Sequence, residues 1–153
     1  MALSFKSEVK IRLERLENGD LRIKFNNVTM EDLTIMKFGI PKEKMGGEAR
    51  QLLATSLVEC MCSTLISLLN WARVDLKMFQ AEAEVISGKD EEGRLCIDSI
   101  NVNINIGIPE DEETLRKLKR AEVLFERGCL MSRSLKRGIK VNWSINTQSR
   151  NSP

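Results

Sequence analysis

The sequence predicts an α+β fold in which mostly antiparallel sheets pack around one long central helix. Three patterns lead to this prediction. Residues 9–25 alternate like two strands joined by a tight turn, residues 48–71 have the pattern of a long helix, and residues 100–108 alternate strictly again. Strands and helices come in runs rather than as repeated strand–helix–strand units, and such an order is typical of α+β proteins.

Composition and charge indicate one soluble domain. The chain has 153 residues, of which 42% are hydrophobic and 30% are charged, and its formal net charge is +2. We expect a single domain over residues 1–146 and a polar, disordered tail over residues 147–153. The N-terminus lacks the pattern of a secretory signal, and no apolar run reaches the roughly 18 residues of a membrane span. We therefore expect a cytoplasmic protein that binds neither nucleic acid nor membranes.

The first two strands are predicted by alternation and by a turn signal. Apolar residues of the first strand alternate with charged ones, at Val9, Ile11 and Leu13. This pattern is typical of a half-buried strand. Asn18-Gly19 is a strong hairpin signal, and the returning strand carries its apolar face at Leu21, Ile23 and Phe25. Residues 26–47 contain several glycines and a proline, so we expect connections with at most one short strand there.

Residues 48–71 are predicted to form the long helix because they contain no glycine or proline. Apolar side chains cover most of its circumference, at Leu52, Leu53, Leu57, Met61, Leu65, Leu68 and Leu69. A helix that is apolar nearly all round is usually buried. We expect it in the middle of the fold or in a subunit interface.

The second half of the chain is predicted to contain two long strands, two helices and a last strand. A charged turn at residues 88–93 joins the long strands, and the second strand turns one apolar side inward, at Ile100, Val102, Ile104, Ile106 and Ile108. Asp111 is placed to cap the next helix, whose mostly apolar face holds Leu115, Leu118, Glu122 and Phe125. Gly128 ends this helix, and a short helix runs from Cys129 to about Arg137. The last strand would carry Ile139, Val141, Trp143 and Ile145 on one side.

The chain has four cysteines and no histidine. Without histidine, Ser-His and Cys-His catalysis and every imidazole ligand are excluded. We expect no metal and no bound cofactor, since no Cys-x-x-Cys motif is present. In a reducing cytoplasm such cysteines are buried and inert, metal ligands, or redox-active.

The positions of the cysteines distinguish them from one another. Cys60 and Cys62 lie about 200° apart around the predicted helix, so they face nearly opposite sides. Cys96 lies in a strand, with nothing near it that suggests chemistry. Cys129 begins the short helix, where backbone N–H groups favour a thiolate, and Arg127 and Arg133 are close in sequence. A structural role as a buried side chain remains open for each of the four.

Two segments resemble the OsmC/Ohr family of osmotically inducible and organic hydroperoxide resistance proteins. Residues 51–60, QLLATSLVEC, resemble the helix that carries the first cysteine of that family. Residues 128–135, GCLMSRSL, and 138–141, GIKV, resemble its second-cysteine segment and last strand. The order and separation of these segments match as well, so the resemblance extends over the chain up to the tail. It implies an intertwined homodimer with two long helices between sheets and two sites at the subunit interface.

The same resemblance implies a thiol peroxidase that reduces organic hydroperoxides to alcohols. Cys60 would be the peroxidatic thiolate, which becomes a sulfenic acid, and Cys129 the resolving thiol, which converts it to a disulfide. The expected partners are an organic hydroperoxide and an external dithiol that reduces the disulfide.

The sequence also departs from the family pattern. The glutamate that the family carries ten residues before the first cysteine is Arg50 here, and the proline after the second cysteine is Leu130. Arg12, Arg15 and Glu48 are the remaining candidates for supporting the thiolate. These departures keep an alternative open, a non-enzymatic protein of the same scaffold that binds an apolar ligand or has a structural role.

Overall fold

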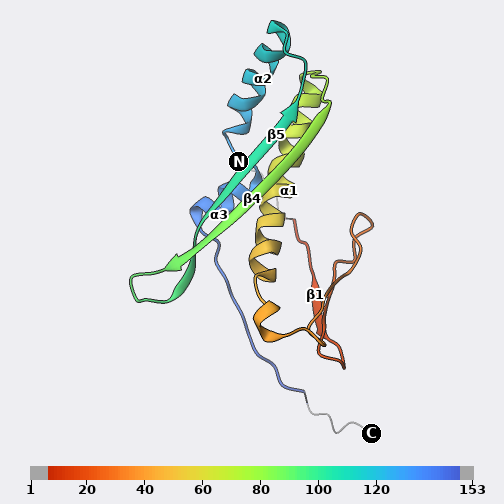
Figure 1. Ribbon diagram of the computed structural model, residues 1–153, viewed down its shortest axis with the longest axis vertical. Helices are drawn as coiled ribbons and strands as arrows, with labels where there is room; N and C mark the ends of the chain where they lie inside the picture. Colours follow the sequence, from red (N-terminus) through yellow and green to blue (C-terminus); the bar gives the residue numbers. More distant parts are fainter. Residues whose placement is uncertain (1–6, 149–153) are drawn as a thin grey trace, which may run out of the picture. The chain divides into compact units, whose positions relative to one another are not determined.

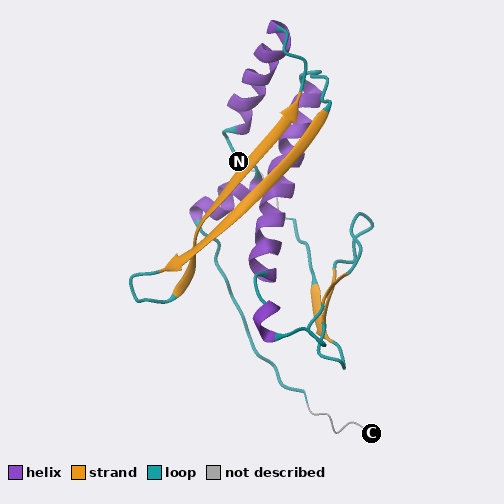
Figure 2. Ribbon diagram, viewed as in Figure 1, coloured by secondary structure: helices purple, strands orange, loops and turns teal. Residues whose placement is uncertain are grey.

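The computed structural model describes residues 7–148, and these fall into two compact units, one up to residue 49 and one from residue 50 onward. The predicted α+β class is confirmed, with one long helix and two antiparallel sheets (Figures 1 and 2). That residues 1–146 make a single domain stays a prediction. Of the predicted tail, residues 149–153 lie outside the described residues.

The N-terminal unit contains a three-stranded antiparallel sheet. Its strands are β1 (Arg12–Arg15), β2 (Leu21–Lys24) and β3 (Leu33–Ile35), in the order β1-β2-β3, and a 3-10 turn follows at Lys42–Lys44. The predicted hairpin is confirmed: Gly19 adopts a φ of 96°, and the Leu16 N–H donates to the Asp20 carbonyl at 2.8 Å.

The prediction that Val9 and Ile11 belong to a half-buried strand is wrong for this chain. β1 begins only at Arg12, and the side chains of Val9 and Ile11 are 93% and 63% exposed. The register explains the difference: Arg12 pairs with Lys24, the last residue of β2. A strand needs a neighbour for its backbone hydrogen bonds, and β2 ends before it reaches Val9.

Helix α1 spans Glu48–Trp71, as the sequence predicts. One face of it is buried within the chain, at Ala54, Leu57, Leu65 and Leu69, whereas Trp71 is exposed. By length and composition alone, the region Lys42–Trp71 could cross a membrane, with a mean hydropathy of 1.8 over its most apolar window. Core helices of soluble proteins have the same composition.

The long hairpin of β4 (Met78–Lys89) and β5 (Leu95–Gly107) supplies the second sheet, and Figure 1 shows it running along α1. Met78 pairs with Gly107 and Lys89 with Leu95. The predicted inward face of β5 is confirmed at Ile104 and Ile106, which pack against the core as does Ile108 after the strand, whereas Ile100 and Val102 line a cavity. That core has Leu69, which is 0% exposed, at its centre, surrounded by Leu65, Val74 and Ala121.

Helix α2 spans Glu112–Phe125 and has the predicted cap, with Asp111 accepting the Thr114 N–H at 2.9 Å. Its buried face differs by one position from the prediction. Ala121 is buried between Leu118 and Phe125, whereas Glu122 points into solvent. Ala121 belongs to the same core cluster as Leu65 and Leu69 of α1.

Helix α3 spans Leu130–Arg137, but the last predicted strand does not form in this chain. Residues 138–148 have no regular secondary structure, and their alternating apolar side chains are exposed, with Trp143 at 81%. Alternation gives a segment two distinct faces, but a strand forms only where another strand accepts its hydrogen bonds. The segment has no such neighbour among the described residues.

Candidate active site

The structure brings together the two cysteines that the sequence analysis singled out. Cys60 lies in the middle of α1 and is partly exposed, whereas Cys129 directly precedes α3 and is 5% exposed. Each thiol lies close enough to shift the pKa of the other, with Cys129 raising that of Cys60 and Cys60 lowering that of Cys129. Two residues 69 positions apart in sequence, 129 − 60, are therefore neighbours in space.

Gly128 gives the chain the sharp turn that places Cys129. It adopts a φ of 78°, a left-handed conformation that favours glycine. A Cβ atom at this position would lie 2.8 Å from the Ser132 Oγ and 2.9 Å from the Arg133 Cγ. The absence of a side chain at residue 128 thus leaves the space that the Ser132 hydroxyl occupies beside Cys129.

Cys129 is the N-cap residue of α3. Its Sγ accepts a hydrogen bond from the Ser132 backbone N–H at 3.4 Å, and the Ser132 Oγ lies 3.5 Å from the same sulfur. The Ser132 hydroxyl also lies 3.2 Å from the Cys129 carbonyl oxygen. The sulfur takes the position that a serine or aspartate oxygen usually occupies at the start of a helix.

This position makes Cys129 the more acidic thiol of the pair. Burial raises its pKa, but the Ser132 hydroxyl, the Ser132 N–H, the Cys60 thiol and the Met131 N–H all lower it, and the net pKa is lowered. Arg127 and Arg133 are not among these causes, so their expected contribution is replaced by donors of α3 itself. A thiolate is stabilised by hydrogen-bond donors at a helix N-terminus.

Cys60 has the opposite environment. Burial is the main cause of its raised pKa, and the charges of Cys129 and Glu59 add to it. The Met131 N–H acts in the other direction. In the middle of a helix the backbone N–H groups are already bonded to carbonyls one turn earlier, so α1 offers Cys60 no free donor.

A cavity of about 730 Å³ opens beside Cys129, which lines it directly. Helix α1 contributes Leu57 and Met61 to the wall, and Cys60 lies next to Met61 in the chain without lining the cavity itself. The rest of the wall is mostly apolar, with Asp98, Glu126 and Lys136 as its charged groups. A cavity of this size, mostly apolar with a few polar groups, is typical of a small-molecule site.

The remaining two cysteines lie elsewhere. Cys62 is partly buried in α1, and burial raises its pKa, as does the charge of Glu59. Cys96 is exposed in β5. All four cysteines are free thiols, and no group of three or more Cys, Asp or Glu side chains within residues 7–148 is arranged to hold a metal ion.

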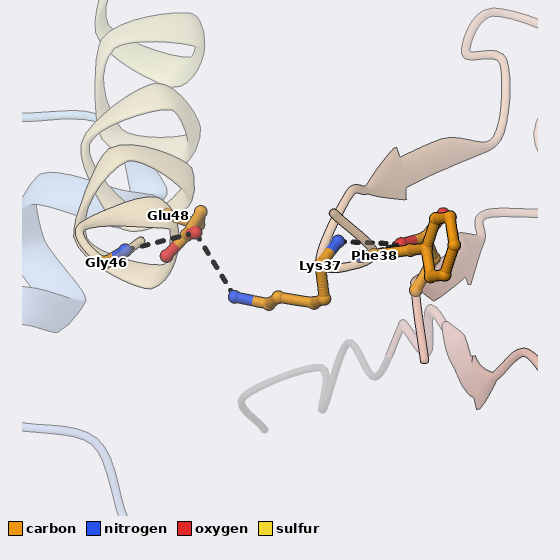
Figure 3. Close-up of polar contacts among 5 residues, drawn as sticks. Lys37, Phe38, Gly46 and Glu48 are labelled. Atoms are coloured by element: carbon orange, nitrogen blue, oxygen red, sulfur yellow. Dashed lines mark hydrogen bonds and ion pairs between the residues drawn. The ribbon is translucent and has the colours of Figure 1, made fainter. Parts of the chain in front are cut away.

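The three candidates for thiolate support belong to the N-terminal unit. Arg12 pairs with Glu14 at 3.1 Å, and Arg15 ends β1 opposite Leu21. Glu48 begins α1, and its carboxylate accepts the Lys37 ammonium at 3.2 Å and the Gly46 N–H at 3.3 Å (Figure 3). Their role beside Cys60 stays a prediction.

The same close-up shows how the N-terminal unit fixes Lys37 (Figure 3). The Asp20 carboxylate accepts the backbone N–H groups of Lys37 at 2.7 Å and Phe38 at 2.8 Å. Hydrogen bonds from the Phe38 and Lys37 N–H groups lower the pKa of Asp20. The pKa of Glu48 is lowered by backbone N–H donors, its own first, and by the Lys37 ammonium.

Arg50, which stands where the family has its glutamate, contacts the long hairpin. Its guanidinium donates to the Ser87 hydroxyl of β4 at 3.1 Å. This contact lies at the register irregularity between Ile86 and Ser87. Arg50 therefore has a structural partner in the unit that contains both thiols.

Comparison with protein families identifies the family of this chain. A sequence model of the family described as OsmC-like protein matches residues 42–144, about two thirds of the chain and both thiols. The chain belongs to the OsmC-like family. No curated protein matches it.

Solved structures of OsmC-like proteins share the fold. An OsmC-like protein from Mycoplasma pneumoniae superposes with a TM-score of 0.66 at 14% identity, covering 86% of this chain and 89% of that one. An OsmC-like protein of unknown function from Vibrio cholerae gives 0.64 at 14%, with 84% and 93% covered. An organic hydroperoxide resistance protein from Elizabethkingia anophelis gives 0.52 at 16%, with 82% and 88% covered.

Ser132 is the site residue that the sequence analysis missed. Its signal is nevertheless present, since Cys129-x-x-Ser132 has the N-cap to N3 spacing over which helix capping works. Sulfur is a rare capping atom, so the pattern is easily passed over in favour of the basic residues nearby.

Proposed function

We propose that this OsmC-like protein is a thiol peroxidase that reduces organic hydroperoxides with Cys60 and Cys129. The observation that carries the proposal is the proximity of these two thiols, together with the largely apolar cavity that Cys129 lines. The hydroperoxide resistance protein among the structural neighbours supports the same chemistry.

The first step is attack by Cys60 on the distal oxygen of the hydroperoxide. The S–O bond forms as the O–O bond breaks, and the alkoxide leaves as an alcohol after taking a proton. Cys129, which is the more acidic thiol, is the base beside Cys60 that accepts the Cys60 proton and passes it to the alkoxide. Cys60 is then a sulfenic acid, and Cys129 is a thiolate again.

The second step joins the two sulfur atoms. The Cys129 thiolate attacks the sulfenic sulfur, the S–S bond forms, and hydroxide leaves and is protonated to water. An external dithiol in the cytoplasm returns two electrons and two protons to the pair. No bound cofactor takes part in this sequence.

The cavity supports an organic rather than an inorganic hydroperoxide. Most of its wall is apolar, contributed by Leu53, Leu57, Met61, Ile97, Ile100, Val102 and Phe125. Burying an apolar substituent there contributes about 25 cal/mol per Å² of apolar surface, a gain that hydrogen peroxide does not offer. We expect cumene hydroperoxide to be reduced faster than hydrogen peroxide.

We further propose that the active form is a homodimer. α1 buries only one face within the chain, and the alternating side chains of residues 139–145 are exposed without a neighbouring strand among the described residues. A second copy would cover both surfaces without requiring a membrane. Light scattering on the purified protein should give the mass of two chains, whereas a monomer in solution would contradict the dimer.

Thiol titration tests the peroxidase. After one equivalent of cumene hydroperoxide, the wild type should lose two of its four titratable thiols and Cys60→Ser should lose none. Cys96→Ser is the matched control, because Cys96 is exposed in β5, and it should still lose two. Intact thiols in the wild type would overturn the proposal. That result would instead favour the alternative, a binding protein for apolar ligands that uses the same cavity.

A further inference from the structure

Two polar groups of Ser132 lie beside the Cys129 sulfur. The Ser132 N–H donates to the Cys129 Sγ at 3.4 Å, and the Ser132 Oγ accepts from the thiol at 3.5 Å. Gly128 keeps this position open, because any larger residue would place its Cβ 2.8 Å from the Ser132 Oγ. Ser132 therefore lies in the first turn of α3, directly after the turn that Gly128 allows.

The sulfur atoms also differ in access and acidity. Cys60 is partly exposed, whereas Cys129 is 5% exposed. Burial raises the pKa of Cys60, and it also raises that of Cys129, but the hydrogen-bonding groups around Cys129, with those of Ser132 foremost, together lower the pKa of that thiol. In thiol–disulfide exchange, the thiol of lower pKa leaves faster, and the accessible sulfur is attacked.

We propose that Ser132 is a positioning residue that makes Cys129 the leaving thiolate, so that the external dithiol attacks the Cys60–Cys129 disulfide at the Cys60 sulfur. This inference rests on the proposed redox pair. It concerns the reduction of the disulfide, which regenerates the enzyme, rather than the reduction of the hydroperoxide.

The disulfide is reduced by two successive thiol–disulfide exchanges. A thiolate of the dithiol forms a disulfide bond with Cys60 as the Cys60–Cys129 bond breaks, and the electron pair of that bond goes to Cys129. Ser132 receives the new charge with its N–H and its hydroxyl, which rotates from the Cys129 carbonyl toward the sulfur. The second thiol of the dithiol then attacks its own mixed-disulfide sulfur and releases Cys60, so the dithiol is oxidised by two electrons.

The test starts from a disulfide made with diamide, which needs no peroxidase activity. Reduction by dithiothreitol is followed by rapid quenching in the wild type, Ser132→Ala, Ser132→Thr and Ser134→Ala. Ser132→Ala should be reduced about threefold more slowly, because the leaving thiol becomes less acidic. Ser132→Thr keeps the hydroxyl and should restore the wild-type rate. Ser134→Ala, the same change two residues along α3, is the control and should have no effect.

The site of attack is measured separately. A monothiol, 2-mercaptoethanol, is added to the diamide-oxidised protein, and the mixed disulfide is trapped and located by mass spectrometry. Trypsin cleaves after Arg50, Arg73, Arg127 and Arg133, so Cys60 and Cys129 fall on different peptides. Fragmentation distinguishes Cys60 from Cys62. The adduct should be on Cys60.

Each outcome decides between the proposals. An adduct on Cys129 would overturn the proposed role of Ser132, as would reduction of the Ser132→Ala disulfide at the wild-type rate. Neither result would contradict the proposed peroxidase activity. The expected pattern with diamide but no oxidation by cumene hydroperoxide supports Ser132 and overturns the peroxidase. Failure of diamide to join Cys60 to Cys129 overturns both.

Discussion

Cys60 and Cys129 are neighbours, yet one lies in the middle of a helix and the other at the beginning of one. At Cys129 the first N–H groups of α3 have no carbonyl partner in the helix, and the sulfur accepts one of them. At Cys60 the N–H groups of α1 are already used. The pKa of one thiol is therefore lowered and that of the other raised, although the two lie close together. Position along a helix, rather than nearby basic side chains, thus separates the roles of two identical groups.

Kinetics of the single variants give the largest expected effect and the strongest test of this comparison. Cys60→Ser should lower the rate of cumene hydroperoxide reduction by about a thousandfold or more, because a hydroxyl is a poor nucleophile at neutral pH. Without an external thiol, Cys129→Ser should consume one equivalent and keep Cys60 as a sulfenic acid instead of forming a disulfide. Hydroperoxide consumption is measured with dithiothreitol in excess for Cys60→Ser, and in its absence, together with trapping of the sulfenic acid, for Cys129→Ser. The reverse pattern would exchange the roles of the two thiols.

The turn before Cys129 can be tested through stability. Gly128→Ala should lower the free energy of unfolding by about 2–3 kcal/mol, since it combines backbone strain of about 1–2 kcal/mol with a displaced Ser132. Gly138→Ala is the matched control, because Gly138 has a similar φ of 81° but open space around it. It should cost about 1–2 kcal/mol. Urea unfolding measures both, and equal losses would mean that Ser132 is not held by this turn.

The acidity difference can be measured directly by thiolate absorbance as a function of pH. A lowered pKa means that the thiolate persists to lower pH, so the signal lost in Cys129→Ser should have its midpoint below that of an ordinary thiol. The signal lost in Cys60→Ser should have its midpoint above that value. Ser132→Ala should move the Cys129 midpoint upward. If the Cys60 and Cys129 thiolates titrated with the same midpoint in the wild type, the proposed difference in acidity between the two thiols would be wrong.

The smallest effects concern the two helix caps. Asp111→Ala should lower the free energy of unfolding by about 1 kcal/mol, because it removes the acceptor for the Thr114 N–H. Cys129→Ser replaces one capping atom by a better one and should change stability by less than about 0.5 kcal/mol. Thermal unfolding of both variants provides the measurement. A large loss of stability in Cys129→Ser would indicate that the sulfur stabilises the fold by packing in the interior rather than by capping α3.

Local patterns along the sequence predicted most elements because their causes are local. The bounds of α1, the hairpin at Gly19, the Asp111 cap and the start of α3 at Cys129 all depend on residues within a few positions of one another. The lowered pKa expected for Cys129 also has a local cause. That cause is Ser132, three residues along the chain, but it is recognised only if the sulfur is treated as a helix-capping atom.

Two alternating segments mark the limit of this reasoning. Residues 100–108 and 139–145 have the same pattern, but the first segment lies largely in β5, paired with β4, and the second pairs with no strand among residues 7–148. Alternation determines which side chains share a face, whereas pairing requires another strand. The first strand fails at Val9 for the same reason.

Short-range geometry and side-chain chemistry set the helices, the Asp111 cap, the order of strands β1 to β5 and the choice of candidate cysteines, so these features could be predicted from the sequence. Long-range packing sets the proximity of Cys60 and Cys129, the cavity beside Cys129, the orientation of Ser132 toward that sulfur and the contact of Arg50 with Ser87. These contacts join residues that are far apart in the sequence or that are oriented by one particular turn. They depend on how the whole chain packs, so no pattern along the sequence predicts them.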